Sequence, residues 1–326
     1  MTNDYVLDER EGWLPHLQTL HRQFYEQADD RCLLWVNPAQ SDPFADDPLV
    51  DERRVRVPIQ HLNFDVRFAP YLVPLDLSRS ADADVFKRSV ARAWNDWELQ
   101  NLEAFNGQAI GGWIACDQSI QSLAQHWAVN CHIHRVGDLT KLLRFHDPGV
   151  REWLWPTLTS LQQRQMLGPA AAVTAFNRRQ LLMTHAMAPS SEGSRNTEAE
   201  RNGDEPSKLW LTHTQWAQID DYAVVHQAWL RQRAGAPGND WNSVIHGTWE
   251  QPVLSALQAA TRYGIYEAQD REIFAWHALQ LGAEFIEHEK MQPVWKKTAA
   301  GEYYGAACEE VSSGPVDKLW CYLHGK

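Results

Sequence analysis

Apolar residues recur with two different spacings along the first 185 residues, and together they predict alternating helices and strands. Spacings of three and four residues are typical of an amphipathic helix. We expect helices at Trp13–Gln27 and Ser80–Leu102 and after Asp117, which would cap its helix. Short apolar or alternating runs predict strands at Arg31–Val36, Arg53–Val57, Tyr71–Leu77 and Gly111–Cys116. This alternation predicts an α+β or α/β lobe with a mixed, partly parallel sheet and helices against it.

Two strand pairs are predicted between residues 131 and 185. The runs Cys131–Val136 and Lys141–Phe145 flank Gly137-Asp138, a dipeptide that favours a tight turn. Ala170–Phe176 and Gln180–His185 are separated by Asn177-Arg178-Arg179 and predict a second pair. Each pair is expected to form a hairpin.

Two short helices are predicted between these hairpins. Asp147 can accept hydrogen bonds from the free amides of a first turn, and Pro148 is well placed at the first helical position. Thr159 or Ser160, each followed three residues later by Gln, predicts the second start. Gly168-Pro169 is expected to end that helix, because Gly tolerates a left-handed cap and Pro cannot continue the helix.

A polar stretch divides the chain. Residues 189–207 contain no large apolar side chain and are rich in Ser, Glu, Asn and Gly, a composition that cannot offset the entropy cost of folding. We therefore predict a domain at 1–188, a flexible linker at 189–207 and a small all-α lobe at 208–326. Helices in that lobe are expected at Trp216–Leu230, Trp241–Tyr263, Glu267–Phe285 and Met291–Lys297, before a weakly patterned tail.

Composition narrows the possible functions. The chain has 326 residues, 16 Trp and a formal net charge of −12. Most of the Trp residues are expected in the core, and any left outside would favour a recognition surface. The negative charge disfavours nucleic acid and anionic membrane surfaces as partners. Five scattered Cys, with no apolar start and no run of eighteen apolar residues, predict a cytoplasmic protein with free thiols.

One motif carries a resemblance. Leu143-Arg144-Phe145-His146-Asp147-Pro148 and, about twenty residues later, Leu167-Gly168-Pro169 resemble the signature of the type VI secretion effector-loading adaptors, known as domain of unknown function 4123. The likeness covers about residues 30–185. Other matching segments are Cys32–Val36, Pro70–Val73, Gly112–Ile114 and the helix with His126, and a looser likeness appears at Tyr263–Ile265 and Gly282–Phe285. Asn37-Pro38-Ala39 departs from the Asp-Gly-Ala-like turn of that family.

The resemblance implies a function. Such an adaptor is a non-enzymatic chaperone that binds one cognate toxic effector and promotes its loading onto the spike protein VgrG, with no cofactor or metal. The motif residues would be structural or partner-facing: Arg144, Phe145, His146, Asp147, Pro148, Gly168 and Pro169. For Arg144 and Asp147, a buried role at the strand-to-helix junction and a place at the mouth of a binding groove both stay open.

Other chemistry has weaker support in the residues. No phosphate-binding loop or nucleophile elbow occurs. Cys131-His132-Ile133-His134 places two His on one face of a strand, so a metal-dependent hydrolase that uses His132, His134 and the carboxylates of Asp42–Glu52 is an alternative. His288-Glu289 starts a zinc-protease-like motif, but Gln292 replaces its second His. A ligand-sensing domain is a third hypothesis.

Overall fold

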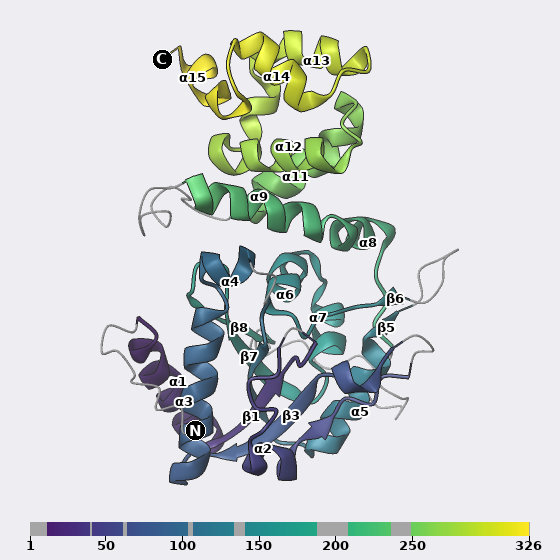
Figure 1. Cartoon of the computed structure of the whole chain (residues 1–326). Helices are drawn as coiled ribbons and strands as arrows, with labels where there is room; N and C mark the ends of the chain where they lie inside the picture. The colour runs from purple at the N-terminus through teal and green to yellow at the C-terminus, as the bar shows by residue number, and fades with distance from the viewer. Residues whose placement is uncertain are drawn as a thin grey trace, which may run out of the picture. The chain divides into compact units, whose positions relative to one another are not determined.

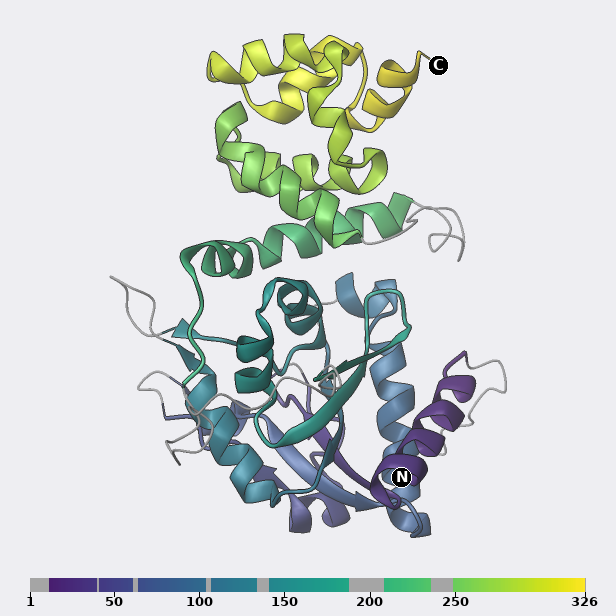
Figure 2. The ribbon, with the colours of Figure 1, turned by 180° about the vertical axis from the view of Figure 1, so that it is seen from behind.

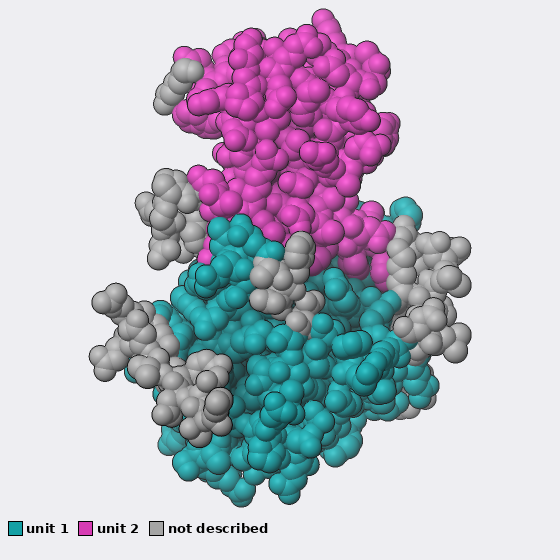
Figure 3. Space-filling model, in the orientation of Figure 1, with its two compact units in different colours: residues 1–215 teal, residues 216–326 magenta. Residues whose placement is uncertain are grey.

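The computed structural model describes residues 12–39, 41–60, 64–103, 107–133, 141–187, 208–235 and 249–325. The chain forms two compact units, residues 1–215 and 216–326 (Figure 3). The predicted linker at 189–207 lies outside the described residues, and residues 208–215 belong to the first unit. An α+β unit is therefore followed by a helical one, which is the predicted fold class.

A six-stranded sheet forms the centre of the first unit (Figure 1). Its order is β2-β3-β1-β4-β7-β8, from strands β1 (Arg31–Val36), β2 (Val55–Arg56), β3 (Tyr71–Asp76), β4 (Ile110–Cys116), β7 (Ala170–Phe176) and β8 (Leu182–Ala186). Every neighbouring pair is antiparallel, so the predicted mixed sheet is wrong. The helical connection from β3 to β4 does join two parallel strands, but β1 inserts between them and pairs antiparallel with both.

Helices cover both faces of this sheet. Helices α1 (Leu14–Ala28) and α3 (Ser80–Asn95) contact each other and the sheet (Figure 1). Strand β4 turns Trp113 toward them, because its indole Nε1 donates to Ser89 Oγ of α3 at 2.9 Å. Trp35 of β1 points to the opposite face, where it stacks on Trp127 of α5 (Ile120–Asn130). Side chains on the two faces of the sheet thus pack into two separate hydrophobic cores.

Several local predictions need correction. Ser41–Glu52, whose clustered carboxylates favour a solvated acidic loop from sequence, overlaps helix α2 (Pro48–Arg53), which Asp47 caps through the amides of Leu49 and Val50. The long predicted helix divides into α3 and α4 (Leu99–Glu103). Ser119, and not Asp117, caps α5 by accepting from the Ser122 amide. In α5 the capping side chain thus lies two residues after the predicted one.

The segment with the motif follows its prediction closely. Helix α6 (Pro148–Leu154) begins after Asp147, and α7 (Ser160–Leu167) begins after a Thr159–Gln162 capping box and ends at Gly168. Strands β7 and β8 form the second hairpin. The first hairpin is shorter than predicted, with β5 (His132–Ile133) paired to β6 (Lys141–Leu142), and its turn lies outside the described residues.

The second unit is helical (Figure 2). Helix α8 (His213–Asp220) spans the division between the units. The other α-helices among the described residues are α9 (Tyr222–Gly235), α11 (Glu250–Ala260), α12 (Ala268–Leu281), α13 (Gln292–Ala299), α14 (Tyr304–Ser312) and α15 (Leu319–His324). The predicted Trp216–Leu230 helix is thus two helices. The tail, which has weak sequence patterning, forms α14 and α15. Each of these two tail helices buries few side chains, so its apolar stripe in the sequence is short.

Aromatic side chains fill the core of the second unit. Phe274 of α12 lies edge-on to Phe285 and Trp295, and Trp295 stacks on Tyr304. His277 bonds the Tyr304 hydroxyl at 2.8 Å, and burial lowers the pKa of His277 to about 4. As predicted, most Trp residues of the described chain are buried.

Candidate functional site

The first half of the motif builds a buried cluster. The rings of Trp35 and Trp127 stack with centroids 3.9 Å apart, and Phe145 lies edge-on to both. The Arg151 guanidinium lies 5.5 Å from the Trp35 ring centroid. We call these four residues the aromatic hub. It joins strand β1, helix α5, the motif and helix α6.

Arg151 is the polar centre of the aromatic hub. It donates to the carbonyls of Phe145 at 2.8 Å and Gly111 at 2.7 Å, and its Nε donates to His185 Nδ1 at 3.3 Å. Burial lowers the pKa of Arg151 to about 10, against the raising effect of Asp147, so the side chain stays charged at neutral pH. A buried cation that satisfies three acceptors fixes the motif on the sheet. Arg151 is not among the site residues predicted from the sequence.

The motif residues themselves have different environments. Asp147 Oδ1 accepts from the amides of Gly149 and Val150, which caps α6. His146 is buried, and burial together with the charges of Arg144 and Arg151 lowers the pKa of His146 to about 3, so the ring is neutral. Arg144 is exposed. The arginine that reaches back to carbonyls at this junction is therefore Arg151.

The second half of the motif lies elsewhere, at the end of α7. Gly168 has φ +59°, and a Cβ there would lie 2.1 Å from the His126 ring of α5. The Trp127 indole donates to the carbonyls of Met166 and Leu167. Gly168 thus lets α5 and α7 approach closely at this end, while Trp127 connects the aromatic hub to the last turn of α7.

An open groove runs between the two helices. It has a volume of about 620 Å³ and is lined by Ser122, Gln125, His126, Val129, Asn130, Leu161, Arg164, Gln165, Gly168 and Pro169. We call it the α5–α7 groove. Two large apolar side chains of its lining are exposed to solvent, Val129 by 43% and Leu161 by 55%. Burial lowers the pKa of His126, which favours a neutral imidazole ring. Arg164 is then the formally charged side chain among the described lining residues.

Residues 208–212 connect the two walls of the groove. Asn130 of α5 accepts from the Leu209 amide at 2.7 Å, and Gln162 of α7 donates to the Trp210 carbonyl at 2.9 Å. The Trp210 side chain is 59% exposed. An aromatic residue of this size left in solvent is typical of an interaction surface.

Two glutamines hold the start of α7 against the start of α8. Gln162 and Gln215 donate to each other through their side-chain amides, both at 3.0 Å. Each glutamine also completes a capping box with a threonine, Thr159 or Thr212. These reciprocal bonds satisfy the two buried side-chain amides. No pattern in the sequence predicts that Gln162 and Gln215 pair.

Residues 64–165 match the family model of a domain of unknown function, DUF4123. The match covers less than half of the chain. It includes the motif residues Arg144–Pro148 and the aromatic hub except Trp35, and it stops before Gly168. No curated protein and no solved structure matches the chain.

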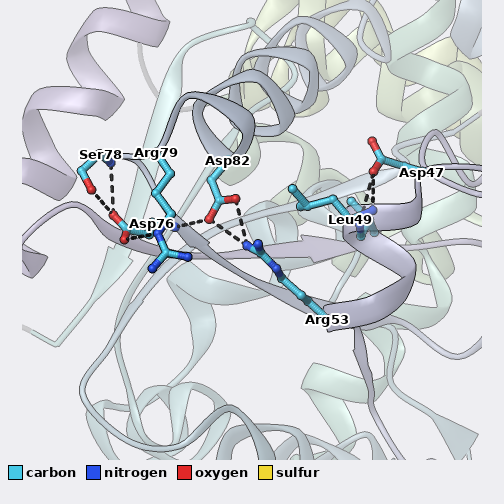
Figure 4. Close-up of polar contacts among 8 residues, drawn as sticks. Asp47, Leu49, Arg53, Asp76, Ser78, Arg79 and Asp82 are labelled. Carbon is cyan, nitrogen blue, oxygen red and sulfur yellow. Dashed lines mark hydrogen bonds and ion pairs between the residues drawn. The ribbon is translucent and has the colours of Figure 1, made fainter.

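A second cavity of the first unit is polar, with a volume of about 540 Å³. Arg53 donates to both carboxylate oxygens of Asp82, which also accepts from the Asp76 amide (Figure 4). Arg79 pairs with the Asp76 carboxylate at 3.0 Å. These charges are neutralised within the chain, which leaves little reason for a charged ligand to bind there.

A third cavity, of about 530 Å³, lies in the second unit. Tyr266 and Tyr303, which line it, are both strongly exposed. Asp270 lies in the same lining and accepts from the amides of Tyr304 and Gly305, so its role is to hold the start of α14.

The side chains of the two histidines of the alternative metal site fall outside what the structure describes. The His132 side chain and all of His134 lie outside the description. Asp42 accepts from the Tyr71 hydroxyl at 2.7 Å, and Asp47 bonds Arg88 as well as its helix amides. Within the described ranges no group of three or more His, Cys, Asp or Glu is placed to hold a metal ion.

Two further sequence predictions concern thiols and membranes. Cys32, Cys116, Cys131, Cys308 and Cys321 are all free. Among the described helices, none has the length and apolar character that a membrane span requires.

Proposed function

We propose that this protein is a non-enzymatic adaptor that binds a cognate type VI secretion effector and promotes its loading onto the VgrG spike. Two findings support this proposal. Residues 64–165 match DUF4123, and the motif, whose first half lies within them, resembles that of the effector-loading adaptors.

The geometry that best supports this proposal is the α5–α7 groove. Its lining is largely apolar, and large side chains stand exposed at Val129 and Leu161. Its histidine is neutral and already bonded to the Gln165 carbonyl at 2.7 Å. Such a surface offers contact area to another protein, whereas proton transfer needs a titratable group that is free to react.

The two-unit organisation suits an adaptor. The first unit carries the motif and the groove, and the second has its own core and an exposed tyrosine pair. Two separate surfaces on one chain can hold two different proteins at high effective concentration.

Co-expression tests the proposal directly. The full-length chain would be produced with the effector encoded by a neighbouring gene and with VgrG, then analysed by affinity purification and size-exclusion chromatography. We expect a stable complex with that effector and co-elution of VgrG. An effector from an unrelated gene cluster is the control. Failure to form any complex with the neighbouring effector or VgrG would contradict the proposal.

Elemental analysis tests the hydrolase alternative. We expect the purified protein to contain no stoichiometric zinc or manganese. Metal at one equivalent that is lost in His132→Ala would instead support the hydrolase, because that substitution removes a predicted ligand.

A further inference from the structure

We propose that the α5–α7 groove binds an amphipathic helix of the effector, with an acidic residue of that helix placed against Arg164. This inference rests on the proposed function and adds to it the surface and the chemistry of the bound segment.

The lining residues have helical spacing on both walls. Helix α5 presents Ser122, Gln125 and Val129, which are three and four residues apart and all exposed. Helix α7 presents Leu161 and Arg164 with the same spacing. Ser122 to Val129 spans about two helical turns, or roughly 10 Å. Two such ridges form a trough into which the side chains of a third helix fit.

Two polar side chains on the floor of the groove, His126 and Asn130, are bonded within the chain. His126 is bonded to the Gln165 carbonyl, and Asn130 bonds the Leu209 amide and the His126 carbonyl. Gly168 and Pro169 add no side-chain donor. A helix satisfies its own backbone groups, whereas an extended peptide would bury amides and carbonyls here at an energetic cost. The floor of the groove therefore favours a helix whose apolar side chains face it.

The charge of Arg164 favours an acidic residue on the bound helix. Arg164 is exposed on α7 and is the formally charged side chain of the described lining. The other nine lining residues carry no formal charge when His126 is neutral, so the groove is locally positive although the chain has a net charge of −12. A carboxylate on the effector helix would pair with Arg164, whereas a basic residue at the same position would be repelled by its guanidinium.

The chain's own linker is a poor occupant. Residues 189–207 contain no large apolar side chain that could fill the groove. An apolar segment of a second protein is consequently the better fit.

Site-specific photo-crosslinking on the full-length complex tests the inference. A photoreactive phenylalanine analogue would replace Leu161, or Leu181 as the control, since Leu181 is 50% exposed but does not line the groove. We expect the Leu161 probe to crosslink the co-expressed effector. The crosslinked peptide should show apolar residues at helical spacing and an acidic residue.

Charge reversal gives a second, quantitative test. Arg164→Glu should weaken effector binding at least about tenfold, a size typical of an interface hot spot. Arg22→Glu, on an exposed position of α1, is the matched control and should bind as the wild type does. Reversing the acidic residue of the crosslinked peptide to Lys or Arg should restore binding to Arg164→Glu. Circular dichroism would verify that each variant is folded.

The outcomes separate the two proposals. If the wild-type chain binds neither effector nor VgrG, the proposed function fails. If it binds the effector while Arg164→Glu and the Leu161 probe behave as their controls do, the function stands and the groove inference is overturned. A crosslinked peptide with strand-like alternation, or one from residues 189–207 of the chain itself, would also overturn it.

Discussion

The aromatic hub and the α5–α7 groove contain halves of one sequence motif, yet they use arginine in opposite ways. Arg151 in the hub is buried and bonds two carbonyls and a histidine. Arg164 in the groove is exposed. The first half of the motif therefore maintains the fold, while the second half shapes a surface. A short motif can serve both purposes because Trp127 connects the two regions.

The largest difference should appear when the two arginines are replaced by methionine. Arg151→Met leaves the Phe145 and Gly111 carbonyls without their donor, so we expect the free energy of unfolding to fall by roughly 3 kcal/mol or more. Arg164→Met should change it by less than about 0.5 kcal/mol. Urea denaturation measures both, and equal losses would abolish the distinction between hub and groove.

Gly168 tests the boundary between the regions. Gly168→Ala should cost roughly 2–3 kcal/mol, because its φ is +59° and the new Cβ would meet the His126 ring. Gly325→Ala is the comparison, since Gly325 is in the left-handed helical region with φ +67° and ψ +33° and has open space around it, and we expect about 1 kcal/mol there. Thermal unfolding of the two variants measures both costs, and an equal loss would contradict the expected clash with His126.

Acid should weaken the hub through His146. An unfolded histidine takes up a proton near pH 6.5, whereas the pKa of folded His146 is about 3. The unfolded state thus binds more protons below pH 6.5. The stability linked to this group is complete above pH 6.5 and is lost as the pH falls toward 3, on the order of 1–2 kcal/mol by pH 5.

His146→Gln should therefore reduce the decline in stability between pH 7 and pH 5. His324→Gln, at an exposed position, is the control and should leave the decline as in the wild type. Unfolding in urea at a series of pH values gives the slopes. An unchanged slope in His146→Gln would show that the ring titrates normally in the folded protein.

The smallest effect concerns the two helix caps. Asp147→Ala should cost about 1–2 kcal/mol, because this buried cap serves α6 next to the hub. Thr159→Ala, at the exposed start of α7, should cost about 0.5–1 kcal/mol. Thermal denaturation monitored by circular dichroism compares them. A larger loss at Thr159 would reverse the expected order.

Local chemistry made part of this structure predictable. The strand Arg31–Val36, the Asp147 cap and the stop at Gly168 each depend on residues that are adjacent in sequence. The antiparallel sheet was not predictable in this way, because it depends on β1 inserting between β3 and β4. Helix periodicity also failed in the tail, where α14 and α15 are too short to repeat an apolar stripe.

The candidate site shows the same limit. The sequence pointed to Gly168 and Pro169, but the groove needs α5, α7 and residues 208–212, which are separated by up to about eighty residues. Arg151 looked like an ordinary residue in the last turn of a helix. Its acceptors come from β4 and the segment before α6, so only the folded chain reveals its role.

The bonds from residues 208–212 have a consequence for the rate and cost of association. Since Asn130 and Gln162 tie both walls to one segment, the width of the groove is set before any partner arrives. Because the α5–α7 groove is preorganised, binding costs less conformational entropy than it would on a mobile surface that becomes ordered only in the complex. Substituting Gln162, which does not line the groove, should loosen the two walls and slow productive docking while every lining residue is retained.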